Sequence, residues 1–298
     1  MIRHPAKTES EPLVPRSFRT SSSGDEISLA LDVWGPKEAP RVILLHGGGQ
    51  TRHSWSTTAR SLANRGYSVF NYDARGHGDS DWSETAAYSL QDRVDDLERI
   101  LELADGPFAI IGASLGGATA LCALAKGLRA EGVVLVDIVP EPEPDGIKKI
   151  TQFMRSRPNG FANLDEAVDA VAKYNPSRPR PTDPSGLMRN LRLREDGRLH
   201  WHWDPQIVQT RPEVHHAQVQ EAARTVADRR NCPVALVRGL ASDVVGDDGV
   251  ARLRELIPDL EVFDVSGAGH MVAGDDNDAF EMAVASFLGR HLPIEREE

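Results

Sequence analysis

Short apolar runs alternate with amphipathic stretches along most of this chain of 298 residues. The runs typical of buried strands fall at residues 41–45, 67–72, 108–111, 133–139, 233–239 and 260–265, and residues 27–34 alternate like a half-exposed strand. Between them, residues 89–103 place their leucines, valine and isoleucine on one helical face, with Ser89 in position to cap the helix. Strands that alternate with helices predict an α/β fold with a parallel sheet covered on both faces.

The composition changes between residues 140 and 230, where the pattern becomes helical and is interrupted by prolines. Within this stretch, Asn163 and Glu166 form the capping pattern that opens a helix. We therefore expect an N-terminal tail over residues 1–16, a core formed by residues 17–139 and 231–298, and a helical lid over residues 140–230.

Charge and composition narrow the class of protein. The chain has 34 Lys and Arg against 45 Asp and Glu, a formal net charge of −11, which disfavours binding to nucleic acid. No apolar run approaches the roughly 18 residues that a membrane span needs. The two cysteines form no CxxC pair, and no apolar leader opens the chain, so we expect a cytoplasmic protein without disulfides. The sequence leaves open whether it forms a homo-oligomer.

The segment Gly112-Ala-Ser-Leu-Gly116 lies between an apolar strand and a helix of small residues. A serine at such a tight strand-to-helix turn takes a strained conformation that only small neighbours allow, and this arrangement raises its hydroxyl above the sheet. The alternative is an ordinary glycine-containing turn with no chemical role. We interpret Ser114 as a nucleophile.

A serine hydroxyl needs a histidine base and an acid that orients it. His270 follows the last predicted strand in a flexible loop, and Asp243 follows the strand before it. We therefore predict Ser114, Asp243 and His270 as the catalytic residues. Asp137, at the end of an earlier strand, and the neighbouring Asp247 and Asp248 are alternative acids.

A glycine run, His46-Gly-Gly-Gly49, follows a buried strand and can point backbone amides at a developing oxyanion. We expect the amides of Gly48 and Leu115 to form this oxyanion hole, since Leu115 follows the nucleophile. A phosphate-binding loop is the other interpretation, but the chain lacks both of the glycine patterns that such loops require.

The predicted lid contains an aromatic cluster at residues 199–205, in a chain with only 6% aromatic residues. We expect an apolar pocket there, since aromatic and flexible side chains suit a hydrophobic substrate. Its candidate lining residues are Trp201, Trp203, Phe153 and Met154. His200 and His202 would need a third ligand to hold a metal ion, so packing is the preferred interpretation and no metal site is predicted.

Beyond these residues, Leu45-His-Gly-Gly-Gly-Gln-Thr-Arg-His-Ser-Trp55 and Tyr72-Asp-Ala-Arg-Gly-His-Gly-Asp-Ser80 resemble motifs of the α/β-hydrolase superfamily, in the branch of haloperoxidases, esterases and epoxide hydrolases. The resemblance runs from about residue 27 to residue 292. It implies a mostly parallel eight-stranded sheet flanked by helices, with the lid inserted after the sixth strand. It also implies that Arg75 and His77 brace the site. Ser114 differs from the aspartate nucleophile of epoxide hydrolases and haloalkane dehalogenases.

Together these features predict a serine hydrolase that cleaves a carboxylic ester, lactone or related acyl compound through an acyl-enzyme, with no metal or organic cofactor. Its expected partner is a small hydrophobic acyl substrate. The same triad could serve a cofactor-free haloperoxidase or perhydrolase, or a hydrolase of carbon–carbon bonds. A non-catalytic binding protein on the same fold is an alternative of another class.

Overall fold

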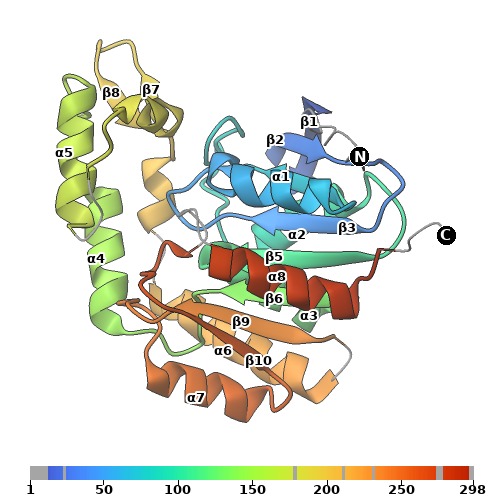
Figure 1. Ribbon diagram of the computed structural model, residues 1–298. Coiled ribbons are helices and arrows are strands. Elements are labelled where there is room, and N and C mark those ends of the chain that lie inside the picture. The colour runs from blue at the N-terminus through green and yellow to red at the C-terminus, as the bar shows by residue number, and fades with distance from the viewer. Residues whose placement is uncertain are drawn as a thin grey trace, which may run out of the picture.

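The computed structural model describes residues 13–22, 25–176, 180–209, 212–229, 232–272 and 278–294. Their main element is an eight-stranded sheet in the order β1-β2-β4-β3-β5-β6-β9-β10 (Figure 1). Its strands are β1 (Leu13–Ser22), β2 (Asp25–Trp34), β3 (Arg41–Leu45), β4 (Ser68–Tyr72), β5 (Phe108–Ala113), β6 (Gly132–Val136), β9 (Val234–Gly239) and β10 (Glu261–Val265). The β1–β2 and β2–β4 pairs are antiparallel, and the other pairs are parallel. The predicted α/β-hydrolase fold with a mostly parallel sheet is thus confirmed.

Strand side chains alternate between two hydrophobic clusters, one on each face of the sheet. On β3, Ile43 and Leu45 belong to one cluster, whereas Val42 and Leu44 belong to the other. This alternation follows from the two-residue period of a strand and explains why the buried strands have apolar residues at every position. The helices that cover the faces are α1 (Ser56–Asn64), α2 (Leu90–Leu101), α3 (Leu115–Lys126), α6 (Pro212–Arg229), α7 (Asp247–Leu256) and α8 (Asp278–His291).

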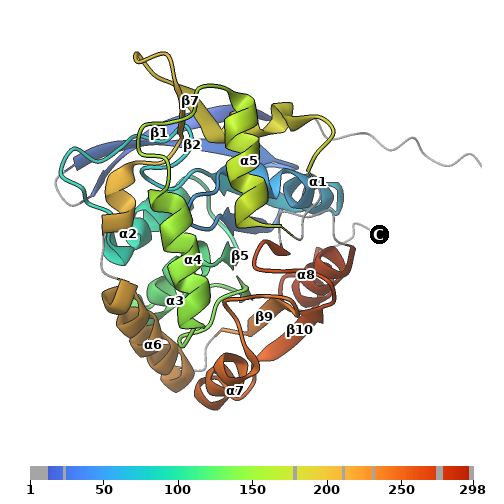
Figure 2. The same ribbon diagram turned by 90° about the vertical axis from the view of Figure 1, so that its left-hand side faces the viewer.

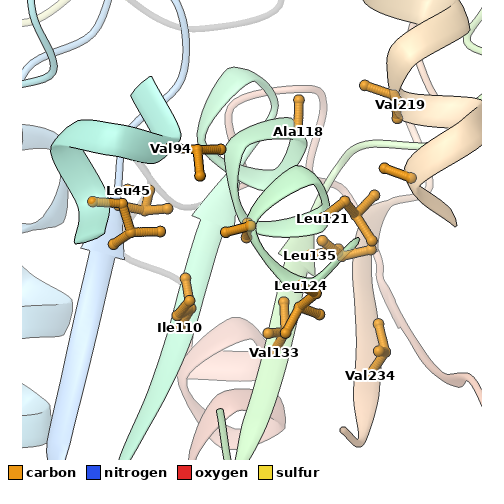
Figure 3. Close-up of a cluster of buried hydrophobic side chains, with 14 of the residues drawn as sticks. Leu45, Val94, Ile110, Ala118, Leu121, Leu124, Val133, Leu135, Val219 and Val234 are labelled. Carbon is orange, nitrogen blue, oxygen red and sulfur yellow. The ribbon is translucent and has the colours of Figure 1, made fainter. Parts of the chain in front are cut away.

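One face carries α2, α3, α6 and α7, and the other carries α1 and α8. Figure 3 shows the first of these interfaces, with Leu121 and Leu124 of α3 above Val133 and Leu135 of β6. The predicted cap on α2 is present, because the Ser89 side chain accepts a hydrogen bond from the Asp92 amide. This packing holds the start of α3, and with it Ser114, at the carboxyl end of β5.

Residues 140–209, here called the cap segment, lie between β6 and β9. They contain α4 (Pro144–Arg155), α5 (Leu164–Tyr174), the short helices η2 (Pro184–Asn190) and η3 (Pro205–Gln209), and a hairpin of β7 (Leu191–Leu193) with β8 (Leu199–Trp201). Figures 1 and 2 show α4 and α5 to one side of the sheet, beyond the ends of its central strands. This is the edge at which the carboxyl ends of parallel strands meet, where α/β proteins bind their ligands.

Two boundaries differ from the sequence prediction. Strand β1 begins at Leu13, inside the range predicted as a tail of residues 1–16. Helix α6 falls in the range 140–230 predicted as a lid, but it packs against α3 and contributes Val219, Ala223 and Val226 to the core. Its apolar face is complementary to α3, a property that its own sequence pattern does not reveal.

Candidate active site

The backbone at Ser114 has the strained geometry that the motif predicts. Its φ of 46° and ψ of −111° are rare for a residue with a side chain, and the residue stands at the N-cap of α3. The close approach is possible only because Gly112 and Gly116 lack side chains. A Cβ on Gly112 would lie 2.6 Å from the Gly116 carbonyl carbon, and one on Gly116 would lie 2.3 Å from the Leu45 oxygen.

His270 lies in the loop after β10, with its Nδ1 2.6 Å from Oδ2 of Asp137. Asp137 follows β6, is 1% exposed, and accepts further hydrogen bonds from the Gly239 amide and the Ser242 hydroxyl. These contacts hold the carboxyl group beside the imidazole and leave Nε2, on the opposite edge of the ring, available for proton transfer.

Asp243, the predicted acid, is not the hydrogen-bond partner of His270, which is Asp137, and this corrects that assignment. Its carboxylate is 44% exposed and pairs with Nζ of Lys149 on α4 at 2.6 Å. The loops after β6 and β9 lie next to each other because these strands pair. Ser242, one residue before Asp243, bonds to Asp137, and Asp243 itself turns outward. The alternative Asp247 pairs with Arg238 at 2.7 Å.

Ser114, Asp137 and His270 line the same pocket, with a volume of about 640 Å³. Gly48 and Leu115, predicted to form the oxyanion hole, line it too. Neither of their amides donates a hydrogen bond to a residue that the structure describes. Leu115 is also the first residue of α3, where the helix dipole favours negative charge.

The loop His46 to Gly49, here called the glycine loop, is held by three histidine side chains. His46 Nδ1 lies 2.8 Å from the Gly47 oxygen, and His77 Nε2 accepts from the Gly49 amide at 3.1 Å. His202 Nε2 lies 3.3 Å from the Gly49 oxygen. No sequence pattern connected His202 with the glycine loop, because its partners there are backbone atoms.

All three imidazoles are buried and neutral. Burial lowers the pKa of His46, lowers the pKa of His77 well below its usual range, and lowers the pKa of His202 to about 3. The hydrogen bonds agree, since Nε2 of His46, Nε2 of His77 and Nδ1 of His202 each accept from a backbone amide. A nitrogen that accepts a hydrogen bond carries no proton.

Charged side chains fasten the loop after β4 to the loop after β3 and to helix α2. The guanidinium of Arg52 pairs with Asp73 and lies 2.9 Å from Asp79, and Arg75 forms two hydrogen bonds of 2.6 Å with Asp96. Arg75 and His77 thus make the bracing contacts that the resemblance implies. Neither is among the residues that line the pocket.

The four residues predicted to contact substrate all line the pocket. The rings of Trp201 and Trp203 stack 4.9 Å apart, and Phe153 lies 5.4 Å from Trp201. Met154 is adjacent, with its Sδ close to Gly48. These side chains give the pocket a mostly apolar wall.

His200 and His202, the two histidines of the aromatic cluster, have different partners in the structure. His200 lies 2.8 Å from Asp196 on the hairpin, whereas His202 reaches the glycine loop. The described residues contain no group of three or more His, Cys, Asp or Glu that could hold a metal ion. Among these residues, no helix is long and apolar enough to cross a membrane.

Comparison with known proteins agrees with the fold and the motifs. Residues 42–283 match the model of the alpha/beta hydrolase family, so the chain belongs to this family. It is 33% identical to an esterase of Mycobacterium tuberculosis over 255 residues, which cover 81% of this chain and 80% of that protein. A crystal structure of an esterase from the same organism has a TM-score of 0.71 at 28% identity and covers 93% of this chain and 92% of that one.

A second relative is named for a different substrate. The chain is 29% identical to 2-(acetamidomethylene)succinate hydrolase of Mesorhizobium japonicum over 269 residues, covering 87% of this chain and 92% of that protein. These relatives are all hydrolases. They support a hydrolase for this chain, and their names do not agree on one substrate.

Proposed function

We propose that the protein is a serine hydrolase that cleaves a carboxylic ester, lactone or related acyl substrate. The observation that carries the proposal is the strained turn at Ser114, in a pocket that also contains the hydrogen-bonded pair of His270 and Asp137. The esterase relatives support the same class of reaction.

The proposed reaction proceeds through an acyl-enzyme. Ser114 Oγ attacks the carbonyl carbon while His270 Nε2 takes its proton, and Asp137 stabilises the imidazolium that forms. The amides of Gly48 and Leu115 donate to the oxyanion of the tetrahedral intermediate. His270 then protonates the leaving alcohol. Water, deprotonated by His270, attacks the acyl-enzyme. The tetrahedral intermediate collapses as His270 returns that proton to Ser114 Oγ, which releases the acid and restores Ser114.

The pocket favours an apolar acyl group. Its wall of Trp201, Trp203, Phe153 and Met154 offers aromatic and thioether surface. Its volume of about 640 Å³ falls within the range of about 300–1,000 Å³ that is common for small-molecule sites. The cap segment supplies all four of these residues, so we propose that it acts as the lid over the substrate.

The test is hydrolysis of p-nitrophenyl esters, from acetate to decanoate, by the purified protein and by Ser114→Ala. The proposal predicts turnover by the wild type with a preferred acyl length, and loss of at least about 10³-fold in kcat for the variant. Ser61→Ala, on helix α1 with its hydroxyl on Glu281, is the matched serine control and keeps full activity. Equal rates for the wild type and Ser114→Ala would contradict the proposal.

Parallel assays separate the other uses of the same triad. Halide oxidation that depends on hydrogen peroxide and exceeds ester hydrolysis would indicate a haloperoxidase or perhydrolase. Turnover of a vinylogous 1,5-diketone acid, without ester turnover, would indicate cleavage of a carbon–carbon bond. Saturable binding of a ligand without any turnover would indicate a binding protein.

A further inference from the structure

His202 connects the cap segment to the glycine loop. Its Nδ1 accepts from the Gly78 amide at 2.7 Å, and its Nε2 lies 3.3 Å from the Gly49 oxygen. Because a backbone amide can only donate, the ring proton stands on Nε2, which therefore donates to Gly49. The side chain is 1% exposed, its bond to Gly78 is buried, and its bond to Gly49 is partly buried.

The three imidazoles act on successive peptide groups of the glycine loop. The Gly47 oxygen, bonded by His46, shares a peptide plane with the Gly48 amide. The Gly49 amide, bonded by His77, belongs to the next plane, and the Gly49 oxygen, bonded by His202, to the one after. The direction of the Gly48 N–H is thus fixed through a chain of neighbouring peptide groups.

The glycine loop needs external support. Gly49 has a φ of +73°, in the left-handed region, and glycine is the most conformationally free residue. An oxyanion hole stabilises a transition state only when its amides are held in the correct direction before the reaction. Here the external support comes from two other segments, through His77 of the loop after β4 and His202 of the cap segment.

His202 is the only one of the three histidines that the cap segment supplies. The next residue, Trp203, forms part of the pocket wall, and its ring would be 3.5 Å from a Cβ on Gly49. The residue after that, Asp204, bonds through its amide to the Gly76 oxygen and through its carboxylate to Tyr88. This part of the cap segment is therefore fixed to the loop after β4 on both sides of Trp203.

We infer that His202 is a positioning residue, which orients the Gly48 amide for the oxyanion by holding the carbonyl group of Gly49. The inference rests on the proposed function, in which Gly48 is an oxyanion donor. Through His202, the cap segment would then affect the rate of the chemical step, in addition to forming the pocket wall.

Two substitutions separate the two hydrogen bonds of His202. The Oδ1 of His202→Asn stands near the original Nδ1 and keeps the bond to the Gly78 amide, but the side chain is too short to reach Gly49. The Nε2 of His202→Gln reaches the position of the original Nε2 and keeps the donor to Gly49. We expect kcat for the preferred ester to fall about tenfold in His202→Asn, with KM changed less than about twofold, since a misdirected oxyanion donor affects the transition state alone. His202→Gln should keep several times more of the wild-type kcat.

The control is His200→Gln, two residues earlier on strand β8 and bonded to Asp196, which should keep wild-type kcat and KM. Rates are normalised to the fraction of active sites titrated with a phosphonate, so that a folding defect does not enter kcat. Affinity for a trifluoromethyl ketone, which binds as a tetrahedral adduct, should fall in parallel with kcat, and affinity for the product acid should not. An unchanged normalised kcat in His202→Asn, or equal losses in the Asn and Gln variants, would overturn the inference.

A measurement on the native protein covers the case in which the variants do not fold. Nitrogen-15 spectra of the imidazoles should show His202 neutral, with its proton on Nε2, near neutral pH. A cationic ring or a proton on Nδ1 would overturn the inference. Absence of Ser114-dependent ester hydrolysis in the wild type would instead contradict the proposed function, whereas intact wild-type activity with an unaffected His202→Asn contradicts only this inference.

Discussion

Asp137 accepts hydrogen bonds at both of its carboxylate oxygens. The Gly239 amide donates to Oδ1, and the Ser242 hydroxyl and His270 both lie 2.6 Å from Oδ2. A carboxylate with this many donors keeps its orientation, as the partner of a catalytic imidazole requires. Asp243 is 44% exposed and pairs with a lysine that is itself 49% exposed, an arrangement that contributes little to stability.

Asp137→Asn and Asp243→Asn should therefore differ sharply. The first places an amide beside His270 Nδ1 and favours the wrong tautomer, so we expect kcat to fall by about 10³- to 10⁴-fold. The second removes one member of an exposed ion pair and should change kcat by less than about threefold. Ester hydrolysis by the two purified variants makes the comparison. A large loss in Asp243→Asn with little effect of Asp137→Asn would contradict the arrangement described here.

The sequence predicted Ser114 and His270 because each stands in a local pattern that constrains it. The glycines around Ser114 are required by contacts below 3 Å, and these requirements are visible in the chain itself. The carboxylate that pairs with His270 could not be identified in this way. Asp137 and Asp243 both follow strands that end at the same edge of the sheet, and which side chain turns inward depends on Ser242 and Lys149, contacts that no single pattern encodes.

Strand β5, the turn at Ser114 and helix α3 form one tightly packed element. Gly116 lies against the end of β3, where a Cβ would approach the Leu45 oxygen to 2.3 Å. Because that oxygen belongs to a buried central strand, it cannot move aside easily. The fit of this turn therefore depends on the absence of side chains as much as on the contacts that it makes.

Gly116→Ala should lower the free energy of unfolding by about 2–3 kcal/mol, as expected for overpacking in a well-packed core. Gly289→Ala is the matched control, since Gly289 lies in α8 and a Cβ there would meet no atom within 4 Å. It should raise stability by up to about 1 kcal/mol, because alanine is the better helix former. Urea unfolding of both variants provides the test, and a Gly116→Ala protein as stable as wild type would refute the steric argument.

Elements of the core could be predicted more fully than those of the cap segment. Helix α2 and strand β3 have strong periodicity and occupy the predicted positions within one or two residues. Strands β7 and β8 have three residues each, too few for a two-residue period to be recognised. They form because the hairpin pairs Leu191 with Trp201, a tertiary contact that local sequence does not specify.

Buried neutral histidines link the stability of the whole molecule to pH. His202 has a pKa of about 3 in the folded protein, against about 6.5 for an unfolded chain. Between these values the unfolded state binds one more proton, so stability is fully present above about pH 6.5 and is lost as the pH falls toward about 3. Burial lowers the pKa of His46 and His77 as well, so their contributions have the same sign.

The free energy of unfolding should therefore be nearly constant above about pH 7.5 and fall below about pH 6.5, with each buried histidine contributing about 1.4 kcal/mol per pH unit. Urea titrations at a series of pH values measure this slope. In His202→Gln, the fall in unfolding free energy per pH unit should be smaller by the contribution of one histidine, about 1.4 kcal/mol. An unchanged stability between about pH 7 and pH 5 would mean that these imidazoles are not held neutral.

Folding brings together three loops that are distant in sequence, after β5, β6 and β10, at one edge of the sheet. In the proposed function, this edge of the sheet makes Ser114 a nucleophile. The most direct test is mass spectrometry of the protein after treatment with diethyl p-nitrophenyl phosphate, which leaves a stable phosphoryl group on an activated serine. We expect a single adduct on the peptide that contains Ser114, its absence in Ser114→Ala, and much slower formation in Asp137→Asn than in Asp243→Asn. An adduct on another residue, or none at all, would show that Ser114 is not the nucleophile.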